Sequence, residues 1–153
     1  MLNTKLISKI FGSLLLIEAL LMSCSLGVAL YYGGSDVMPF TWSVVVLIAA
    51  GVAFRLLGLT ASTALSRRDA YFVVTTVWVL FTIFGMMPFL IGGYLHSVTD
   101  AFFETISGFT TTGATIIDYP ERLPRGLLFW RSITQWIGGL GIVFFTIAIP
   151  PSF

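Results

Sequence analysis

Four long apolar stretches dominate the pattern of the chain. A transmembrane helix needs about 20 mostly apolar residues, and each of these stretches is long enough to cross a bilayer. The pattern therefore predicts an all-α membrane protein with four transmembrane helices. The stretches cover approximately residues 10–32, 40–60, 70–95 and 126–149.

The segment 96–125, between the third and fourth stretches, begins with the short apolar block DAFFETISGF. This block is too short to span a membrane, and apolar runs of about 10–14 residues are typical of buried or re-entrant helices. Ser97 and Asp100 have the spacing of a capping box, and an acidic residue in the first turn favours a helix start. We expect a short helix over about 99–109 that enters the membrane and returns to the same side, with a plain external loop as the alternative.

The polar run TTTGAT follows this expected helix at residues 110–115. Irregular backbone at membrane depth is tolerated only where it is buried in protein or lines a water-filled path. Its carbonyl and hydroxyl oxygens can replace the water shell of a cation, as carbonyl rings do in potassium filters. Gly113 supplies freedom to adopt positive φ, and the negative C-terminal end of the helix would attract a cation. Pro120 and Pro124 would keep the returning chain extended.

A metal-dependent catalytic centre is the alternative interpretation of the same segment. His96, Asp100 and Glu104 follow an i, i+4, i+8 spacing that could place three ligands on one helical face. However, His96 precedes the expected helix start, and the chain has no second cluster such as an HExxH pair. Asp100 and Glu104 are better explained as solvated or helix-capping residues at the outer mouth. The sequence therefore favours a protein without catalytic residues.

Composition supports a membrane setting and excludes several functions. The chain has 153 residues, of which 57% are hydrophobic and only 10% charged, and its mean hydropathy is +0.97. The net charge of +1 gives no broad basic surface for nucleic acid. The lone cysteine, Cys24, can form neither an internal disulfide nor a multi-thiolate metal site. We expect no cofactor, and we expect the apolar run at the N-terminus, too long for a signal peptide core, to be a retained span.

Lysine and arginine in the short loops predict the orientation in a cell (inner or plasma) membrane. Lys5 and Lys9 precede the first span, and Arg67 and Arg68 lie between the second and third. The loop 33–39 has no basic residue. The pattern predicts a multi-pass protein with a cytoplasmic N-terminus and with the segment 96–125 entering from outside.

Three charged residues lie inside the apolar stretches, where a charge is costly and a functional hypothesis by default. We expect Glu18 to pair with Arg55 or with another helix as a structural clasp rather than to bind an ion. Arg131 could neutralise Glu104 or Asp118, or it could anchor its helix at the membrane surface.

Small residues and a proline predict two features of helix geometry. The patch GGLG at 138–141 favours close helix packing, with a bend as the alternative. Pro88 and the two glycines Gly92 and Gly93 predict a kink near the outer end of the third span.

The stretches DAFFETISGFTTTGAT and LPRGLLFWRSITQWIGGLGIV resemble the TrkH/TrkG group of the Trk/Ktr/HKT superfamily of potassium transporters. The resemblance implies a filter built from four helix–pore–helix repeats in one chain, and a cytoplasmic TrkA-like nucleotide-binding regulatory subunit. It implies that 1–66 is an N-terminal helix pair and 67–153 the first repeat, with potassium the transported ion at Thr111, Thr112 and Gly113. A single filter glycine is usual for that group. The filter positions that the resemblance implies are Thr110, Thr111, Thr112, Gly113, Ala114 and Thr115.

One repeat cannot make a ring that needs four contributors. The missing contributors would be further repeats of a longer chain or identical copies, embedded with this chain in the lipid bilayer. The resemblance favours a fragment of a longer transporter. The alternative is a truncated structural membrane fragment that does not conduct.

Overall fold

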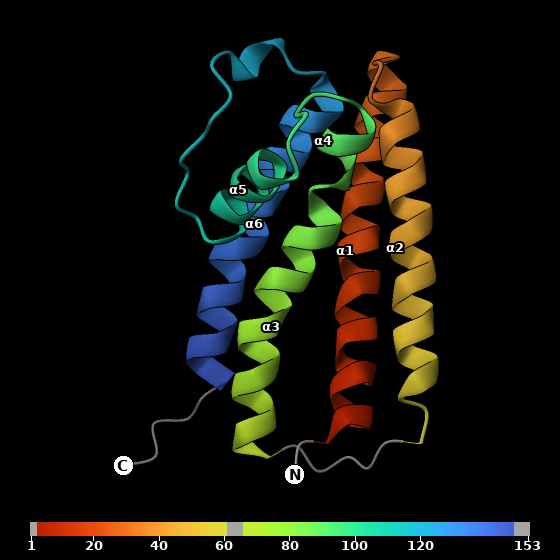
Figure 1. Cartoon of the computed structure of the whole chain (residues 1–153), viewed down its shortest axis with the longest axis vertical. Coiled ribbons are helices and arrows are strands. Elements are labelled where there is room, and N and C mark those ends of the chain that lie inside the picture. Colours follow the sequence, from red (N-terminus) through yellow and green to blue (C-terminus); the bar gives the residue numbers. More distant parts are fainter. Residues whose placement is uncertain (1–2, 61–65, 149–153) are drawn as a thin grey trace.

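The computed structural model describes residues 3–60 and 66–148, and every regular element within these ranges is helical. The prediction of an all-α fold is therefore confirmed. In chain order the elements are α1 (Thr4–Tyr32), α2 (Val37–Leu57), α3 (Arg67–Gly85), α4 (Met87–Ile91), α5 (Val98–Phe109), the 3-10 turn η1 (Pro120–Arg122) and α6 (Arg125–Ala148). Figure 1 shows α1 and α2 side by side, with α3 and α6 beside them and the short α5 on the outer flank of α6.

Within the described ranges, three helices are long and apolar enough to cross a membrane: Thr4–Tyr32, Val37–Leu57 and Arg68–Ile91. They correspond to the first three predicted spans. The fourth stretch is also helical, as α6, but it is not one of the three helices found within the described residues. Its role as a fourth span therefore stays a prediction.

Glycines bring α1 and α2 into close contact. A side chain at Gly12 of α1 would place its Cβ 2.5 Å from the amide nitrogen of Arg55, and one at Gly51 of α2 would reach Leu16 at 2.9 Å. At Gly12 the obstacle is backbone, so only glycine fits, whereas at Gly51 the Leu16 side chain would have to shift. Small residues drive such packing in membranes because lipid offers no hydrophobic force between helices.

The third candidate span is broken near its C-terminal end, where the sequence predicts a kink. α3 ends at Gly85, and α4 begins with Pro88 in its first turn. Proline has no N–H, so the Phe84 carbonyl loses its regular i+4 donor. The next carbonyl, that of Gly85, accepts from the indole Nε1 of Trp130 on α6 at 2.9 Å.

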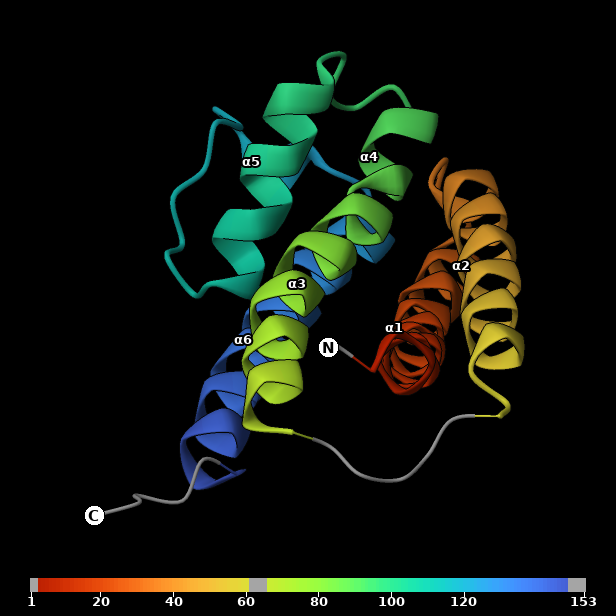
Figure 2. The same cartoon turned by 60° about the horizontal axis from the view of Figure 1, so that its bottom comes forward.

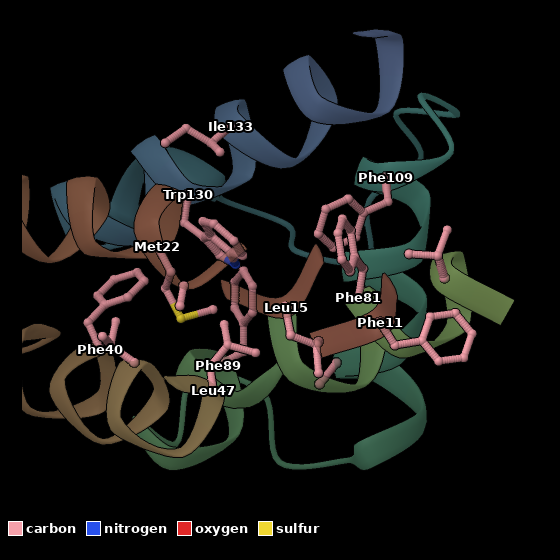
Figure 3. Close-up of a cluster of buried hydrophobic side chains, with 14 of the residues drawn as sticks. Phe11, Leu15, Met22, Phe40, Leu47, Phe81, Phe89, Phe109, Trp130 and Ile133 are labelled. Atoms are coloured by element: carbon pink, nitrogen blue, oxygen red, sulfur yellow. The ribbon is translucent and has the colours of Figure 1, made fainter. Parts of the chain in front are cut away.

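Aromatic side chains fill the centre of the bundle, as Figure 3 shows. Trp130 and Phe109 are fully buried, and their rings meet edge to face with centroids 6.3 Å apart. Phe81 of α3 packs on Phe109 at 5.6 Å between centroids. The core thus joins α3, α5 and α6, and it fixes the position of the short helix that precedes TTTGAT.

A buried carboxylate in the turn between α1 and α2 caps α6. Oδ2 of Asp36 accepts from the amide of Leu127 at 3.0 Å, and Asp36 is fully buried. The first four amides of a helix have no partner within it, and a negative charge near them is stabilising. Asp36 therefore joins the N-terminal helix pair to the start of α6, a contact that sequence reasoning missed.

Asp36→Ala should lower the free energy of unfolding by about 1–3 kcal/mol, because it leaves a buried amide without an acceptor. Thermal unfolding of the purified protein in detergent measures this loss. Asp118→Ala, which removes an exposed acid from the loop before α6, is the control and should unfold at the wild-type temperature. Equal melting temperatures for the wild type and both variants would show that the Asp36 contact contributes nothing.

Candidate ion-conduction segment

α5 lies where the sequence predicts the short helix, but it begins without the predicted cap. The helix runs from Val98 to Phe109, and Asp100 is in its first turn. Ser97 is the N-cap residue, yet its side chain makes no capping hydrogen bond, so the expected capping box is wrong. A capping box does form at the start of α3, between Ser66 and Asp69. The extended backbone of Ser97 and the acidic first turn are enough to begin α5.

The chain after α5 turns back toward the end of the bundle from which α5 came. Figure 1 shows the segment after α5 turning at about mid-height of α6 and climbing to η1, and Figure 2 shows α5 from its side. α6 then descends from that same end. The segment 96–125 therefore enters and leaves at one end of the bundle.

The TTTGAT turn contains two residues with left-handed backbone. Gly113 has φ 74°, as its predicted freedom requires, and Thr111 has φ 58°. Positive φ is a genuine outlier for a β-branched residue such as threonine, and strain of this kind concentrates at functional sites. No feature of the sequence indicates a positive φ at Thr111. All six residues from Thr110 to Thr115 are exposed in this chain.

Hydrogen bonds to Ser107 of α5 hold this turn in place. The hydroxyl of Ser107 donates to the Ala114 carbonyl at 2.6 Å, and the Gly113 amide donates to the Ser107 carbonyl at 3.2 Å. The hydroxyls of Thr110 and Thr112 are 2.9 Å apart. Within the described ranges, the carbonyls of residues 111–113 accept no hydrogen bond, so their oxygens are available to a ligand.

Glu104 anchors the end of the turn to α6. Its buried carboxylate accepts from the Thr115 hydroxyl at 2.9 Å and from the Ile116 amide at 3.1 Å. Arg131 of α6 completes the set, with Nη2 2.6 Å and Nε 2.9 Å from Oε1 of Glu104. Of the roles the sequence left open for Arg131, the structure shows pairing with Glu104.

The metalloenzyme alternative is wrong. Within residues 3–60 and 66–148, no three His, Cys, Asp or Glu side chains gather as metal ligands. His96 and Asp100 are exposed, whereas Glu104 is buried and turned toward Arg131. His96 precedes α5, and the Glu104 carboxylate binds Arg131 and the Ile116 amide, so the spacing of four residues does not bring the three side chains together.

The expected pair of Glu18 and Arg55 is also wrong. Arg55 is exposed on α2 and packs along Gly12 of α1, whereas Glu18 is fully buried with neither oxygen bonded in the described part of the chain. Six residues separate Gly12 from Glu18, which is about 240° around a helix of 3.6 residues per turn. Glu18 therefore points away from α2. The direction in which a side chain points around its helix does not follow from its depth in the membrane.

α5 and α6 approach closely through two glycines. A Cβ at Gly138 would overlap the carbonyl oxygen of Phe109, and a Cβ at Gly108 would overlap the hydroxyl of Thr134. Gly139, the next residue, has open space around it. The packing interpretation of the small-residue patch is therefore confirmed at Gly138, which lies against the last residue of α5.

Comparison with known proteins identifies the family. The sequence model of TrkH, described as a cation transport protein, matches residues 37–153. The chain belongs to the TrkH family. This membership makes it a membrane protein of the Trk potassium and cation transport family, not an enzyme.

Two relatives and one solved structure show how much of a Trk protein is present. TrkH of Vibrio parahaemolyticus, a Trk system potassium uptake protein, is 38% identical over 146 residues, which are 95% of this chain and 30% of that protein. TrkG of Escherichia coli is 31% identical over 97% of this chain and 31% of its own length. The crystal structure of the potassium transporter TrkH from Vibrio parahaemolyticus superposes with a TM-score of 0.89 at 37% identity, over 96% of this chain and 32% of that one. The chain thus spans a little under a third of the length of these Trk proteins.

Proposed function

We propose that this chain is the N-terminal portion of a Trk-type potassium uptake protein and supplies one quarter of its ion filter. Potassium would bind the oxygens of Thr111, Thr112 and Gly113, flanked by Thr110, Ala114 and Thr115. The observation that carries the proposal is the exposed turn after α5, whose free carbonyls are held from behind by Ser107 and Glu104. Rings of such carbonyls replace the hydration shell of potassium in known filters.

The remaining elements take their roles from this assignment. Residues 1–66 form an accessory helix pair, and 67–153 form the first helix–pore–helix repeat. In it α5 is a re-entrant pore helix and α6 the fourth span. The lysine and arginine residues of the short loops support a cytoplasmic N-terminus, with the segment 96–125 at the outer face. Arg131 does not oppose a membrane position for α6, because its charge is paired with Glu104.

A complete filter needs three more contributors. Similarity to proteins about three times as long favours further repeats of one chain over identical copies. The resemblance to Trk transporters described above also implies a TrkA-like regulatory subunit on the cytoplasmic side. No nucleic-acid partner is proposed.

Gly113→Asp should abolish potassium transport while the protein still folds. Aspartate is among the non-glycine residues most often found in left-handed backbone, and the control below carries the same strain. The change places a carboxylate among the potassium oxygens. Rubidium uptake measures the effect in potassium-transport-deficient cells that express Vibrio parahaemolyticus TrkH with its matching segment replaced by this chain. Gly93→Asp is the matched control, because Gly93 also has positive φ and open space but lies outside the turn.

The outcomes separate the proposal from its alternatives. Uptake by the chimera that is lost in Gly113→Asp and kept in Gly93→Asp supports the filter assignment. Equal uptake by both variants would show that residues 110–115 are not part of the filter. Expressing only the 153 residues tests assembly: uptake would show that copies form a pore, and its absence beside an active chimera would show that further repeats are required.

A further inference from the structure

Glu18 lies in the middle of α1 with a carboxyl group that no other side chain satisfies. It is fully buried, and neither carboxyl oxygen has a hydrogen-bond partner within the described residues. Its surroundings follow from the space at Gly85: a Cβ there would lie 3.2 Å from Oε1 of Glu18, 3.1 Å from the Thr105 methyl and 3.0 Å from the Phe109 ring. The carboxyl group therefore sits where α1, the end of α3 and the last turns of α5 meet.

No cation of the described chain faces this group. On α2, Arg55 packs at Gly12, about 9 Å along α1 from Glu18 at 1.5 Å per residue. On α6, Arg131 is bound to Glu104 of α5, and that carboxylate is turned toward the TTTGAT segment.

The other charged residues of these helices lie at their ends. On α3 the charged residues are Arg67, Arg68 and Asp69, at the far end of that helix; on α5 and α6 they are Asp100 and Arg125, in the first turns; α4 has none. Because Glu18 has 0% exposure, no further repeat, subunit or lipid headgroup can reach it without opening this junction.

An ionised carboxylate is far more costly than a neutral acid in such a place. Burying an isolated ion without a partner is prohibitive, whereas a protonated carboxyl can be satisfied by one acceptor for its O–H. Ionisable groups inside a membrane are rare and usually functional. The choice is therefore between a proton on Glu18 and a cation that the surrounding structure does not provide.

The break between α3 and α4 provides the acceptor that a protonated carboxyl requires. Because Pro88 has no N–H, the Phe84 carbonyl near the end of α3 loses its regular donor. Trp130 occupies the Gly85 carbonyl from the α6 side. Glu18 approaches the same residue from α1.

We propose that Glu18 is a proton-binding site inside the membrane, a neutral carboxylic acid that donates its O–H to a backbone carbonyl at the end of α3. The bound proton holds α1 against the α3 break and against the base of α5. Loss of the proton places an unpaired charge behind the pore helix and loosens this junction. Protonation of Glu18 thus stabilises the support on which the TTTGAT turn is built.

Infrared spectroscopy of the purified protein in lipid nanodiscs tests the proposal directly. The wild type should show a carboxylic-acid C=O band at neutral pH that shifts in deuterated water and is lost in Glu18→Gln. Asp100→Asn removes an exposed acid and should leave that band unchanged. Absence of the band from the wild type at neutral pH, or its survival in Glu18→Gln, would overturn the proposal.

Thermal unfolding in the same nanodiscs provides a second readout. The melting temperature of the wild type should fall as pH rises and the proton is lost, whereas Glu18→Gln, a neutral isostere, should remove that part of the pH dependence. An unchanged pH profile in Glu18→Gln would contradict the proposal. If Glu18→Gln does not fold, the wild-type band alone decides. Neither readout involves transport, so failure here is distinct from failure of the proposed function.

Discussion

Glu104→Ala should abolish rubidium uptake by the chimera with Vibrio parahaemolyticus TrkH and lower its stability. The variant removes the acceptor of the Thr115 hydroxyl and of the Ile116 amide, and it leaves Arg131 without its anion. Removing one partner of a buried ion pair costs about 3–5 kcal/mol. We expect a loss of about 3 kcal/mol, at the lower end of that range, because the Arg131 side chain retains 23% exposure and solvent screens it.

The effect on transport should exceed the effect on folding. The bonds from Glu104 fix the residues directly after the free carbonyls, and displacing those carbonyls by about 1 Å is enough to spoil a site that depends on geometry. Uptake should therefore be lost even in the fraction of Glu104→Ala that reaches the membrane.

Rubidium uptake at matched protein levels, with thermal unfolding in detergent, measures both effects. Asp100→Ala is the control, because it removes an exposed acid from the first turn of the same helix. Uptake by Glu104→Ala at the level of Asp100→Ala would show that the ion pair with Arg131 does not support the turn. Exchanging the two charges, Glu104→Arg with Arg131→Glu, restores the attraction but not the bonds to Thr115 and Ile116. We therefore expect it to recover stability more than uptake.

The sequence predicts those parts of the structure that depend on local pattern and on backbone freedom. α5 begins one residue before its predicted start and ends at its predicted last residue, Phe109, because an apolar run, an acidic first turn and a polar run mark it. The break before α4 follows from Pro88, whose missing N–H acts locally. The positive φ of Gly113 follows from glycine chemistry in the same way.

Contacts across long separations could not be predicted because they depend on how the helices are rotated. The bond from Leu127 to Asp36 joins residues 91 positions apart. Glu18 and Arg55 both lie in apolar stretches, yet Arg55 packs at Gly12, about 9 Å along α1 from Glu18, and α1 turns Glu18 toward Gly85 rather than toward α2. Depth follows from hydropathy, whereas rotation follows from which side chains interlock. The sequence therefore identifies the charged residues of the candidate site. It offers only one of the observed pairs, Arg131 with Glu104, and that pair is one of several options for Arg131.

Gly138→Ala should have the second large effect, although it adds one methyl group to a helix. That methyl would overlap the carbonyl oxygen of Phe109, which is backbone at the end of α5 and cannot rotate away as a side chain could. Overpacking of this kind costs about 1–3 kcal/mol. The α5 helix must move away from α6, and the TTTGAT turn that begins at the next residue must move with it.

Gly139→Ala separates this packing effect from helix propensity. Both substitutions replace glycine by alanine at successive positions of α6, and each should gain up to about 1 kcal/mol from propensity alone. Gly139 has open space around it, so its variant should be neutral or slightly stabilised and should retain uptake. Gly138→Ala should instead unfold at a lower temperature and lose rubidium uptake.

The opposite signs expected at adjacent positions make the comparison decisive between packing and bending. If the patch at 138–141 served as a bend, both alanines would stiffen α6 and impair uptake to a similar degree. If the patch serves as the packing surface for α5, only Gly138, which lies against Phe109, is sensitive to substitution. Bulkier side chains at Gly139 should then also be tolerated by this chain. The position of the TTTGAT turn is then set by how closely Gly138 lets α5 approach α6.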